Sequence, residues 1–175
     1  MSVRVEHRSG RGNYLTPPKI LERVRAIDAI GLDPASCEGN PTKAHVFVRP
    51  PANGLDFAWH NDHGLVFVNP PYGRKRGLRC REWVLKAIAE HLLGAEIVLL
   101  LPARTDTLWF QALLVRRYPI CFVRGRLVFQ GENSGAPFPS AVVYLGPRPK
   151  KFAAAFADLG VIASGGSAAA KRLAG

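Results

Sequence analysis

The sequence contains few cysteines and few acidic residues, and it has no long uninterrupted apolar run. Its three cysteines, Cys37, Cys80 and Cys121, are widely spaced and form no Cys-x-x-Cys pair. This spacing argues against a disulfide framework or a zinc site and favours a reduced, cytoplasmic setting. No apolar stretch approaches the roughly 18 residues that a membrane-spanning helix needs. We therefore expect a globular protein with no membrane partner and no bound metal.

The shortage of acidic residues leaves a strong positive charge. The chain of 175 residues has 24 Lys and Arg against 13 Asp and Glu, which gives a net charge of +11 and a pI near 10.2. A small domain with this charge usually binds a polyanion. The basic residues are spread over several clusters, which suits phosphate contacts that do not depend on the base sequence. A general solubility charge is the alternative, and composition leaves it open.

The order of apolar segments predicts an α/β domain. Leu65–Val68 and Glu96–Leu101 are short continuous apolar runs, typical of parallel strands that are covered on both faces. Helical spacing of apolar residues after Thr16 predicts a helix with this threonine as its cap. Strand and helix patterns alternate, so we expect a mostly parallel sheet with helices on both faces. Ile120–Val123 and Leu127–Phe129 flank a glycine turn and predict an antiparallel strand pair near the C-terminus.

The composition of the two ends predicts the domain limits. Residues 1–13 are polar and basic and indicate a flexible arm. Residues 14–160 form the predicted domain. Residues 161–175 are rich in Ala, Gly and Ser, so we expect a disordered tail.

The most informative stretch is Asn69-Pro70-Pro71-Tyr72, directly after the apolar run that ends at Val68. Proline has no amide hydrogen and a fixed φ, so two consecutive prolines force the chain out of the sheet. The carboxyl ends of strands are where open α/β sheets bind ligands. An amide oxygen, a proline carbonyl and an aromatic plane at such an edge form a suitable receptor for a planar amine such as adenine.

These residue types suit the activation of an exocyclic base nitrogen toward an electrophile. The nitrogen is a poor nucleophile because its lone pair is conjugated into the ring. Acceptors at the Asn69 side chain and the Pro70 carbonyl would hold its two hydrogens and stabilise the positive charge that develops, as an oxyanion hole does for negative charge. Tyr72 would stack on a base taken out of the duplex. An ordinary strand exit with Pro-Pro as a breaker is the alternative.

Several further motifs occur in a fixed order along the chain, and together they resemble a known family. They are Tyr14-x-Thr16-Pro17, Leu32-Asp33-Pro34-Ala35-Ser36, Gly54-Leu55-x-x-x-Trp59, Val66–Gly73, Leu100–Phe110, Gly125-Arg126-Leu127-x-Phe129 and Pro137-Phe138-Pro139-Ser140. The set resembles the phage-type DNA N6-adenine methyltransferase family (Dam-like), over roughly Tyr14 to Gly146. The resemblance implies a Rossmann-like methyltransferase fold, S-adenosylmethionine as cofactor and double-stranded DNA as partner.

The resemblance also implies roles for individual residues. Asn69, Pro70, Pro71 and Tyr72 match the family's catalytic motif. The residues that match its cofactor-binding segments are Tyr14, Thr16, Pro17, Asp33, Pro34 and Ala35. Asp33 could pair with the cofactor ammonium, and helix-start amides near Thr16 could take its carboxylate. A plain helix cap at Thr16 and an Asp-Pro turn at Asp33 are the structural alternatives.

One departure from the usual pattern concerns the glycine-rich turn that many DNA methyltransferases carry after the first strand. Here the corresponding segment keeps only Gly39. The acid that would bind the ribose hydroxyls is also not evident, and Glu38 and Asp56 are both candidates.

Two rival functions remain open. One is another amino methyltransferase, acting on cytosine N4, RNA or protein glutamine; the other is a DNA-binding protein that has lost catalysis.

Basic residues in the loops are the candidates for DNA contacts. They are Arg74, Lys75, Arg76, Arg104, Arg124 and Arg126. For Arg104 the alternative is a surface residue beside a helix cap, and for Arg124 and Arg126 it is the exposed charge of a hairpin.

Overall fold

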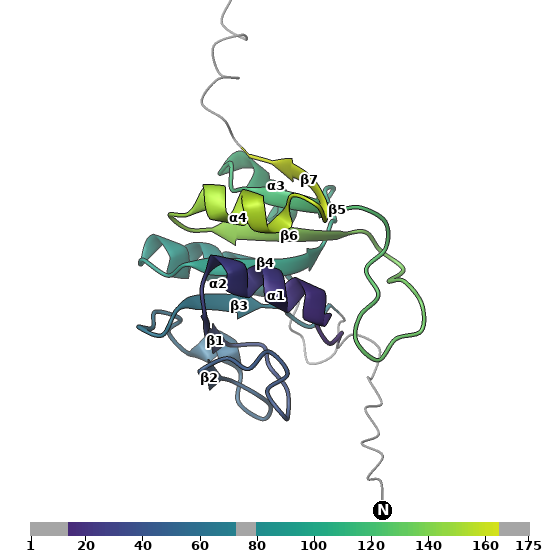
Figure 1. The fold of residues 1–175 in the computed structure, drawn as a ribbon. Helices are drawn as coiled ribbons and strands as arrows, with labels where there is room; N and C mark the ends of the chain where they lie inside the picture. Colours follow the sequence, from purple (N-terminus) through teal and green to yellow (C-terminus); the bar gives the residue numbers. More distant parts are fainter. Residues whose placement is uncertain (1–13, 73–79, 165–175) are drawn as a thin grey trace, which may run out of the picture.

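The computed structural model describes residues 14–72 and 80–164. These residues form a seven-stranded sheet with helices on both faces (Figure 1). The strands are β1 (Ile30–Asp33), β2 (Val46–Phe47), β3 (Leu65–Val68), β4 (Ile97–Pro102), β5 (Ile120–Val123), β6 (Ser140–Leu145) and β7 (Gly160–Ala163). The helices are α1 (Pro18–Ile27), α2 (Cys80–Leu92), α3 (Leu108–Val115) and α4 (Pro149–Phe156), with a short 3-10 helix η1 (Gly54–Asp56). The α/β class predicted from the sequence is confirmed.

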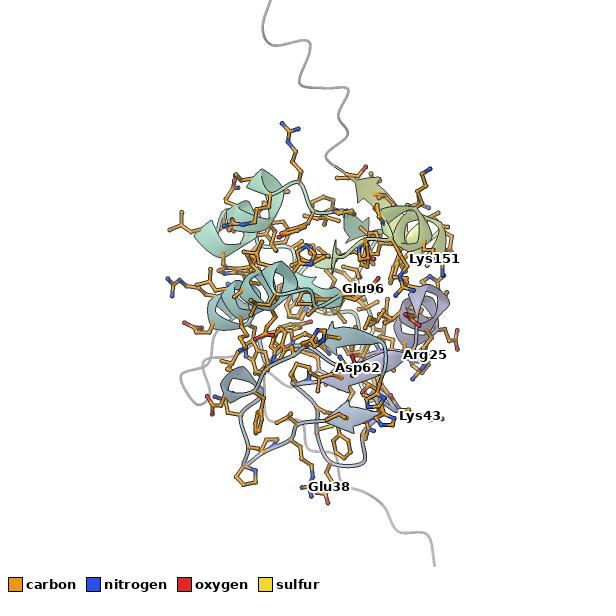
Figure 2. The ribbon with its side chains drawn as sticks, turned by 90° about the vertical axis from the view of Figure 1, so that its left-hand side faces the viewer. Arg25, Glu38, Lys43, Asp62, Glu96 and Lys151 are labelled. Carbon is orange, nitrogen blue, oxygen red and sulfur yellow. The ribbon has the colours of Figure 1, made fainter. Side chains whose placement is uncertain are left out.

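Two hydrophobic layers hold the helices against the sheet. Alternate residues of the buried strands face opposite sides, so Phe67 packs with α1 and α4 while Val66 packs with α2 and α3. Figure 2 shows the same arrangement from the side, with Arg25 of α1 and Lys151 of α4 on one side of the sheet. All residues of β3, β4 and β6 are buried. Strands covered on both faces explain the continuous apolar runs in the sequence.

The strand order is β2-β1-β3-β4-β6-β5-β7. The pairs β1–β2, β1–β3 and β3–β4 are parallel, whereas β4–β6, β5–β6 and β5–β7 are antiparallel. The expectation of a mostly parallel sheet is therefore not confirmed, because β6 lies between β4 and β5 and opposes both. The strands β1 to β5 nevertheless run in one direction. Their carboxyl ends consequently share one edge of the sheet, which we call the carboxyl edge.

The predicted hairpin around Gly125 is wrong in its second strand. The segment 127–129 forms no strand, although Leu127 and Phe129 are both buried. They pack toward the N-terminal segment, and Gln130 makes an isolated antiparallel bridge with Leu15. Their period-2 burial comes from this packing and not from a strand ladder. The antiparallel partners of β5 are instead β6 and β7.

The sheet also extends beyond the predicted domain limit at residue 160. Strand β7 includes residues 161–163 and pairs with β5, so this part of the predicted tail is ordered. Residues 165–175 of the predicted tail and the predicted arm at 1–13 lie outside the described residues. Among the residues that the structure describes, no helix is both long and apolar enough to cross a membrane.

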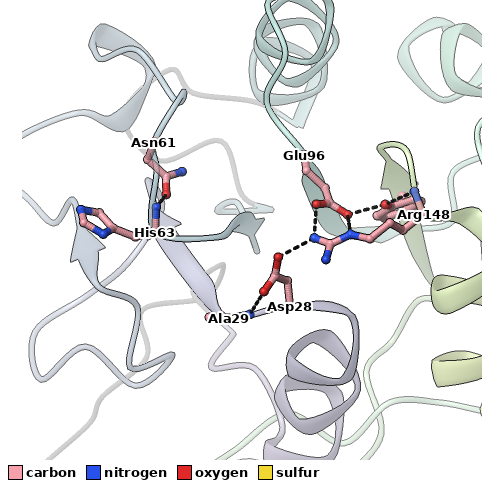
Figure 3. A network of polar contacts seen from close by, with 7 residues as sticks. Asp28, Ala29, Asn61, His63, Glu96 and Arg148 are labelled. Carbon is pink, nitrogen blue, oxygen red and sulfur yellow. Dashed lines mark hydrogen bonds and ion pairs between the residues drawn. The ribbon is translucent and has the colours of Figure 1, made fainter.

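A polar cluster joins four elements at the edge opposite the carboxyl edge (Figure 3). We call it the Arg148 network; it consists of Asp28, Glu96, Tyr144 and Arg148. The Arg148 guanidinium lies 2.6 Å from Asp28 Oδ2 and 3.0 Å, through Nε, from Glu96 Oε1, and its Nη2 also pairs with Glu96 Oε2. The Tyr144 hydroxyl donates to Glu96 and accepts the Arg148 amide at 2.8 Å. The hydrogen bond from Arg148 lowers the pKa of Asp28.

Candidate active site

The Asn69 side chain is held at the carboxyl end of β3 by two residues of the N-terminal segment. Its Nδ2 donates to the Tyr14 carbonyl at 2.6 Å and to the Thr16 hydroxyl at 3.0 Å. Two prolines follow Asn69, so the strand ends here and the amide stands beyond the ladder. The sequence therefore correctly predicts where this motif lies, and the structure adds the contact with a segment more than 50 residues away.

These contacts also fix which way the amide points. A carbonyl such as that of Tyr14 can only accept, so the nitrogen of the Asn69 amide must face it. The amide oxygen then points toward Tyr72, whose hydroxyl lies 2.6 Å from Asn69 Oδ1 and 2.9 Å from the Leu100 carbonyl. Since an amide oxygen has two lone pairs, Asn69 Oδ1 can accept from one more donor. The site thus contains a hydrogen-bond acceptor in a fixed orientation.

Tyr72 belongs to an aromatic cluster that we define as Tyr14, Tyr72, Phe129 and Phe138. The Tyr72 ring centroid lies 5.6 Å from that of Tyr14 and 5.4 Å from that of Phe138, which it meets edge-on at 90°. Phe129 and Phe138 come from the chain that follows β5, so that segment meets the motif after β3. Burial raises the pKa of the Tyr72 phenol well above its usual value, so the hydroxyl remains a donor.

Thr16 does not cap α1, and the prediction that it does is wrong. The residue that precedes the helix is Pro17, and no side chain caps it. Thr16 is buried, and its hydroxyl accepts from Asn69 instead. The start of α1 offers few amides for a ligand carboxylate, because Pro17 and Pro18 have no N–H and the amides of Ile20 and Leu21 donate to Pro17. At most the Lys19 amide remains there for an anion.

Asp33 is a buried acid at the carboxyl end of β1. Its side chain is 3% exposed; Oδ1 accepts the Ala35 amide at 3.0 Å and Oδ2 accepts the Thr42 hydroxyl at 2.8 Å. Within residues 14–72 and 80–164 no ion pair involves Asp33. Burial raises the pKa of Asp33 to about 6, against the effect of these hydrogen bonds. A carboxylate with donors but no cation is suited to a cationic ligand.

The loop that contains η1 packs against the turn that follows Asp33. A Cβ on Gly54 would lie 1.8 Å from the Pro34 carbonyl oxygen, so only glycine allows this close approach. The buried Trp59 fixes the loop, since its indole nitrogen donates to the Gly54 carbonyl at 2.9 Å. The predicted motif from Gly54 to Trp59 therefore supports the turn at Pro34.

The structure does not distinguish between the two acids that the sequence suggests for binding the cofactor ribose. Glu38 and Asp56 are both exposed, and Asp56 Oδ1 accepts from Asn53 at 3.3 Å within η1. Neither position decides between them. Among the described residues, no group of three or more His, Cys, Asp or Glu side chains could hold a metal ion.

Three of the predicted DNA-binding residues lie at the carboxyl edge. Arg104 follows β4, and Arg124 and Arg126 follow β5; all three are exposed. Figure 1 shows the chain between β5 and β6 projecting at the same side of the sheet as the start of α1. The other three, Arg74, Lys75 and Arg76, lie outside the described residues.

Some site residues were not predicted from the sequence. Leu100 contributes only its main-chain oxygen, which no sequence pattern reveals. Thr42 lies in an irregular segment, and none of the sequence motifs includes it. Phe129 and Phe138 occur in motifs that the sequence marks, yet nothing local shows that they meet Tyr72.

A family model described as DNA N-6-adenine-methyltransferase (Dam) matches residues 6–142. The chain belongs to this family. The match includes Asn69, Asp33 and the aromatic cluster, so the family region and the site coincide. The comparison with curated proteins gives no match. A methyltransferase that acts on DNA adenine is consistent with the positive charge of the chain and with the amide acceptor at the carboxyl edge.

Proposed function

We propose that this Dam family member transfers a methyl group from S-adenosylmethionine to the exocyclic N6 of adenine in double-stranded DNA, after the base has been flipped out of the helix. Family membership supports the class of reaction. The observation that carries the proposal is the Asn69 amide, whose oxygen is oriented by the contacts of its nitrogen with Tyr14 and Thr16. An acceptor fixed in this way is suited to the activation of an aromatic amine.

The proposed chemistry needs acceptors and no general base before transfer. Asn69 Oδ1 and the Pro70 carbonyl would accept the two N6 hydrogens, which directs the nitrogen lone pair away from the ring. Acceptors fixed in advance need no reorganisation when positive charge develops on N6. S-adenosylmethionine supplies the methyl group when bound; the new N–C bond forms as the C–S bond breaks, and its electrons remain on sulfur. The proton then leaves N6 to water.

The aromatic cluster would receive the flipped base. Tyr72 would stack on adenine, and the Pro71 turn would keep this ring beside Asn69. Stacking on an aromatic side chain contributes roughly 1–3 kcal/mol for a base, enough to offset much of the cost of unstacking. Arg104, Arg124 and Arg126 would contact the phosphate backbone at the same edge, together with Arg74, Lys75 and Arg76.

The residues at the end of β1 fit the cofactor. Asp33 would bind the cationic amino group, with Pro34 and Ala35 forming the turn around it. The buried Ser36 hydroxyl makes no hydrogen bond among the described residues, so this corner also has an unused donor. Tyr14, Thr16 and Pro17 would face the methionine end of the cofactor, beside Asn69.

The test is transfer of labelled methyl from S-adenosylmethionine to unmethylated duplex DNA. Wild type should give N6-methyladenine after digestion to nucleosides. Asn69→Ala should lower the rate at least about a hundredfold, the loss seen when one fixed electrostatic partner is removed. Its affinity for S-adenosylmethionine should stay within about threefold of wild type, which shows that the variant is folded. Near-normal turnover in Asn69→Ala would sink the mechanism.

The same assay separates the rival functions. Label on N4-methylcytosine, on RNA or on protein glutamine would identify another amino methyltransferase. Duplexes made only of G·C pairs are a matched control, because an adenine methyltransferase cannot label them. No label, with tight DNA binding and no heat of binding for S-adenosylmethionine in calorimetry, would identify a DNA-binding protein without catalysis.

A further inference from the structure

We propose that Thr42, held in place by Asn40, is a positioning residue that directs the Asp33 carboxylate toward the ammonium group of the cofactor. This inference rests on the proposed function, since it assigns a role within the cofactor site. It concerns a residue for which neither the sequence motifs nor the family match gives a role.

The geometry of the turn at 40–44 supports this role. The Asn40 side chain bridges the turn: Oδ1 accepts the Ala44 amide at 3.2 Å, and Nδ2 donates to the Ala44 carbonyl at 2.9 Å. Asn40 has a left-handed backbone with φ of 44°, which asparagine tolerates better than most residues. On the other side, Arg25 of α1 donates to the Thr42 carbonyl at 2.6 Å. Thr42 is thus fixed from both sides and is itself buried.

The Thr42 hydroxyl has one proton and two acceptors within reach. Asp33 Oδ2 lies at 2.8 Å and Asn40 Oδ1 at 3.1 Å. When Asp33 is ionised, the proton belongs on the carboxylate, because a charged acceptor forms the stronger hydrogen bond. When Asp33 is protonated, it can donate to Thr42, whose own proton then turns to Asn40. The turn therefore holds the carboxyl in one orientation in both protonation states.

The turn that begins at Asp33 does not itself require the Thr42 contact. The Ala35 amide on Oδ1 already closes the Asp-Pro turn. The second oxygen is nevertheless buried and accepts from Thr42, and the Ser36 hydroxyl, which makes no hydrogen bond among the described residues, is near enough to lower the pKa of Asp33. Such a carboxylate without a cation is costly unless a ligand brings the missing charge.

The charged and titratable surroundings of Asp33 are few. The Cys37 thiol and Glu38 lie on the following turn, and Arg25 reaches it only through the Thr42 carbonyl. Ser36 is near enough to lower the pKa of Asp33, although outside hydrogen-bonding geometry. The flanking strands β2 and β3 contain no titratable residue. We therefore expect cofactor binding to weaken at low pH mainly because Asp33 becomes protonated, and the pKa of Asp33 depends on its hydrogen-bond donors.

The experiment measures the Kd of S-adenosylmethionine by calorimetry from pH 5 to 8 for wild type, Thr42→Val, Thr42→Ser and Asn40→Asp. Thr42→Val keeps the shape and removes the hydroxyl, so affinity at pH 7 should fall roughly tenfold and the acid limb should move up by about one pH unit. Asn40→Asp adds a like charge near Asp33 and should move the limb in the same direction. Thr42→Ser keeps the hydroxyl and should restore the wild-type profile.

A matched ligand distinguishes positioning from general damage. 5′-Methylthioadenosine lacks the amino-acid part of the cofactor, so all four proteins should bind it with similar Kd. Loss of this affinity as well, or unchanged S-adenosylmethionine profiles in both Thr42→Val and Asn40→Asp, would overturn the inference. If wild type itself binds no S-adenosylmethionine at any pH, the proposed function fails and this inference with it.

Discussion

The two polar clusters at opposite edges of the sheet differ in how their charges are compensated. In the Arg148 network one guanidinium pairs with the carboxylates of Asp28 and Glu96 (Figure 3). At the carboxyl edge the acid of the site, Asp33, is more deeply buried and has hydrogen-bond donors only. The charges of the first cluster are paired within the described chain, whereas Asp33 has no cationic partner among the described residues.

This difference is the basis for assigning the Arg148 network to the stability of the fold and for proposing that Asp33 binds a ligand. Arg148 lies on the chain between β6 and α4, and its partners lie at the end of α1 and the start of β4. It therefore connects segments that the sheet alone does not fix. The hydrogen bonds of the Asp33 side chain within the described residues are local, to the Ala35 amide and the Thr42 hydroxyl. The burial of Asp33 costs free energy that these hydrogen bonds only partly offset, which is typical of a functional site.

Breaking the Arg148 network should have the largest effect on stability. Arg148→Met would leave Glu96 and Asp28 without their shared cation, and we expect a loss of about 3 kcal/mol in the free energy of unfolding. Urea denaturation at pH 7 measures it. The control is Lys150→Met, on the exposed surface of α4, which should change stability by no more than about 0.5 kcal/mol. A folded Arg148→Met protein with strongly weakened cofactor binding would show that the two edges are coupled.

Removing the charge of Asp33 should increase stability, whereas breaking the Arg148 network decreases it. Because the pKa of Asp33 is raised to about 6 in the folded protein, the native state holds a proton that the unfolded chain releases near pH 4. The wild-type protein therefore loses stability as pH rises from about 4 through 6, and Asp33→Asn does not. The difference between the two should grow by about 3 kcal/mol in favour of the variant from pH 4 to pH 7.

The same substitution should weaken the binding of the cofactor. We expect Asp33→Asn to bind S-adenosylmethionine roughly a hundredfold more weakly, the cost of truncating one partner of a buried charge pair. Urea titrations at each pH and calorimetry give the two quantities on the same protein. A difference in stability between Asp33→Asn and wild type that does not grow from pH 4 to 7, or wild-type affinity in the variant, would contradict the comparison between the two edges.

The sequence predicts those parts of the site that depend on short, local patterns. The exit of the chain after Val68 follows from a buried apolar run and two prolines, and α1 follows from helical spacing of apolar residues. Thr16 shows where this reasoning ends. A threonine before two prolines has the local pattern of a cap, yet the residue is buried by a tertiary contact with Asn69 that no local pattern contains.

The strand order and the aromatic cluster could not be predicted from the sequence, because both depend on contacts between segments that are distant along the chain. The position of β6 between β4 and β5 depends on which strands compete for the same edge, and apolar runs of similar composition do not encode that order. Residues 127–129 alternate like a strand because two of their side chains fill the space around Tyr14. Strand β7 is short and adjoins a tail rich in small residues, so its apolar signal is weak.

The smallest effect concerns the Tyr72 hydroxyl, which lies between the Asn69 amide oxygen and the Leu100 carbonyl. Tyr72→Phe removes this donor but keeps the ring in the aromatic cluster. We expect a loss of about 1 kcal/mol in stability and a rate of methyl transfer within about fivefold of wild type, because Asn69 remains oriented by Tyr14 and Thr16. Tyr72→Ala should lower the rate at least about tenfold, since the surface for stacking is lost. Single-turnover transfer to the same duplex measures both variants. If Tyr72→Phe is as inactive as Tyr72→Ala, the hydroxyl and not the ring carries the function of this residue, and the orientation of Asn69 depends on both of its ends.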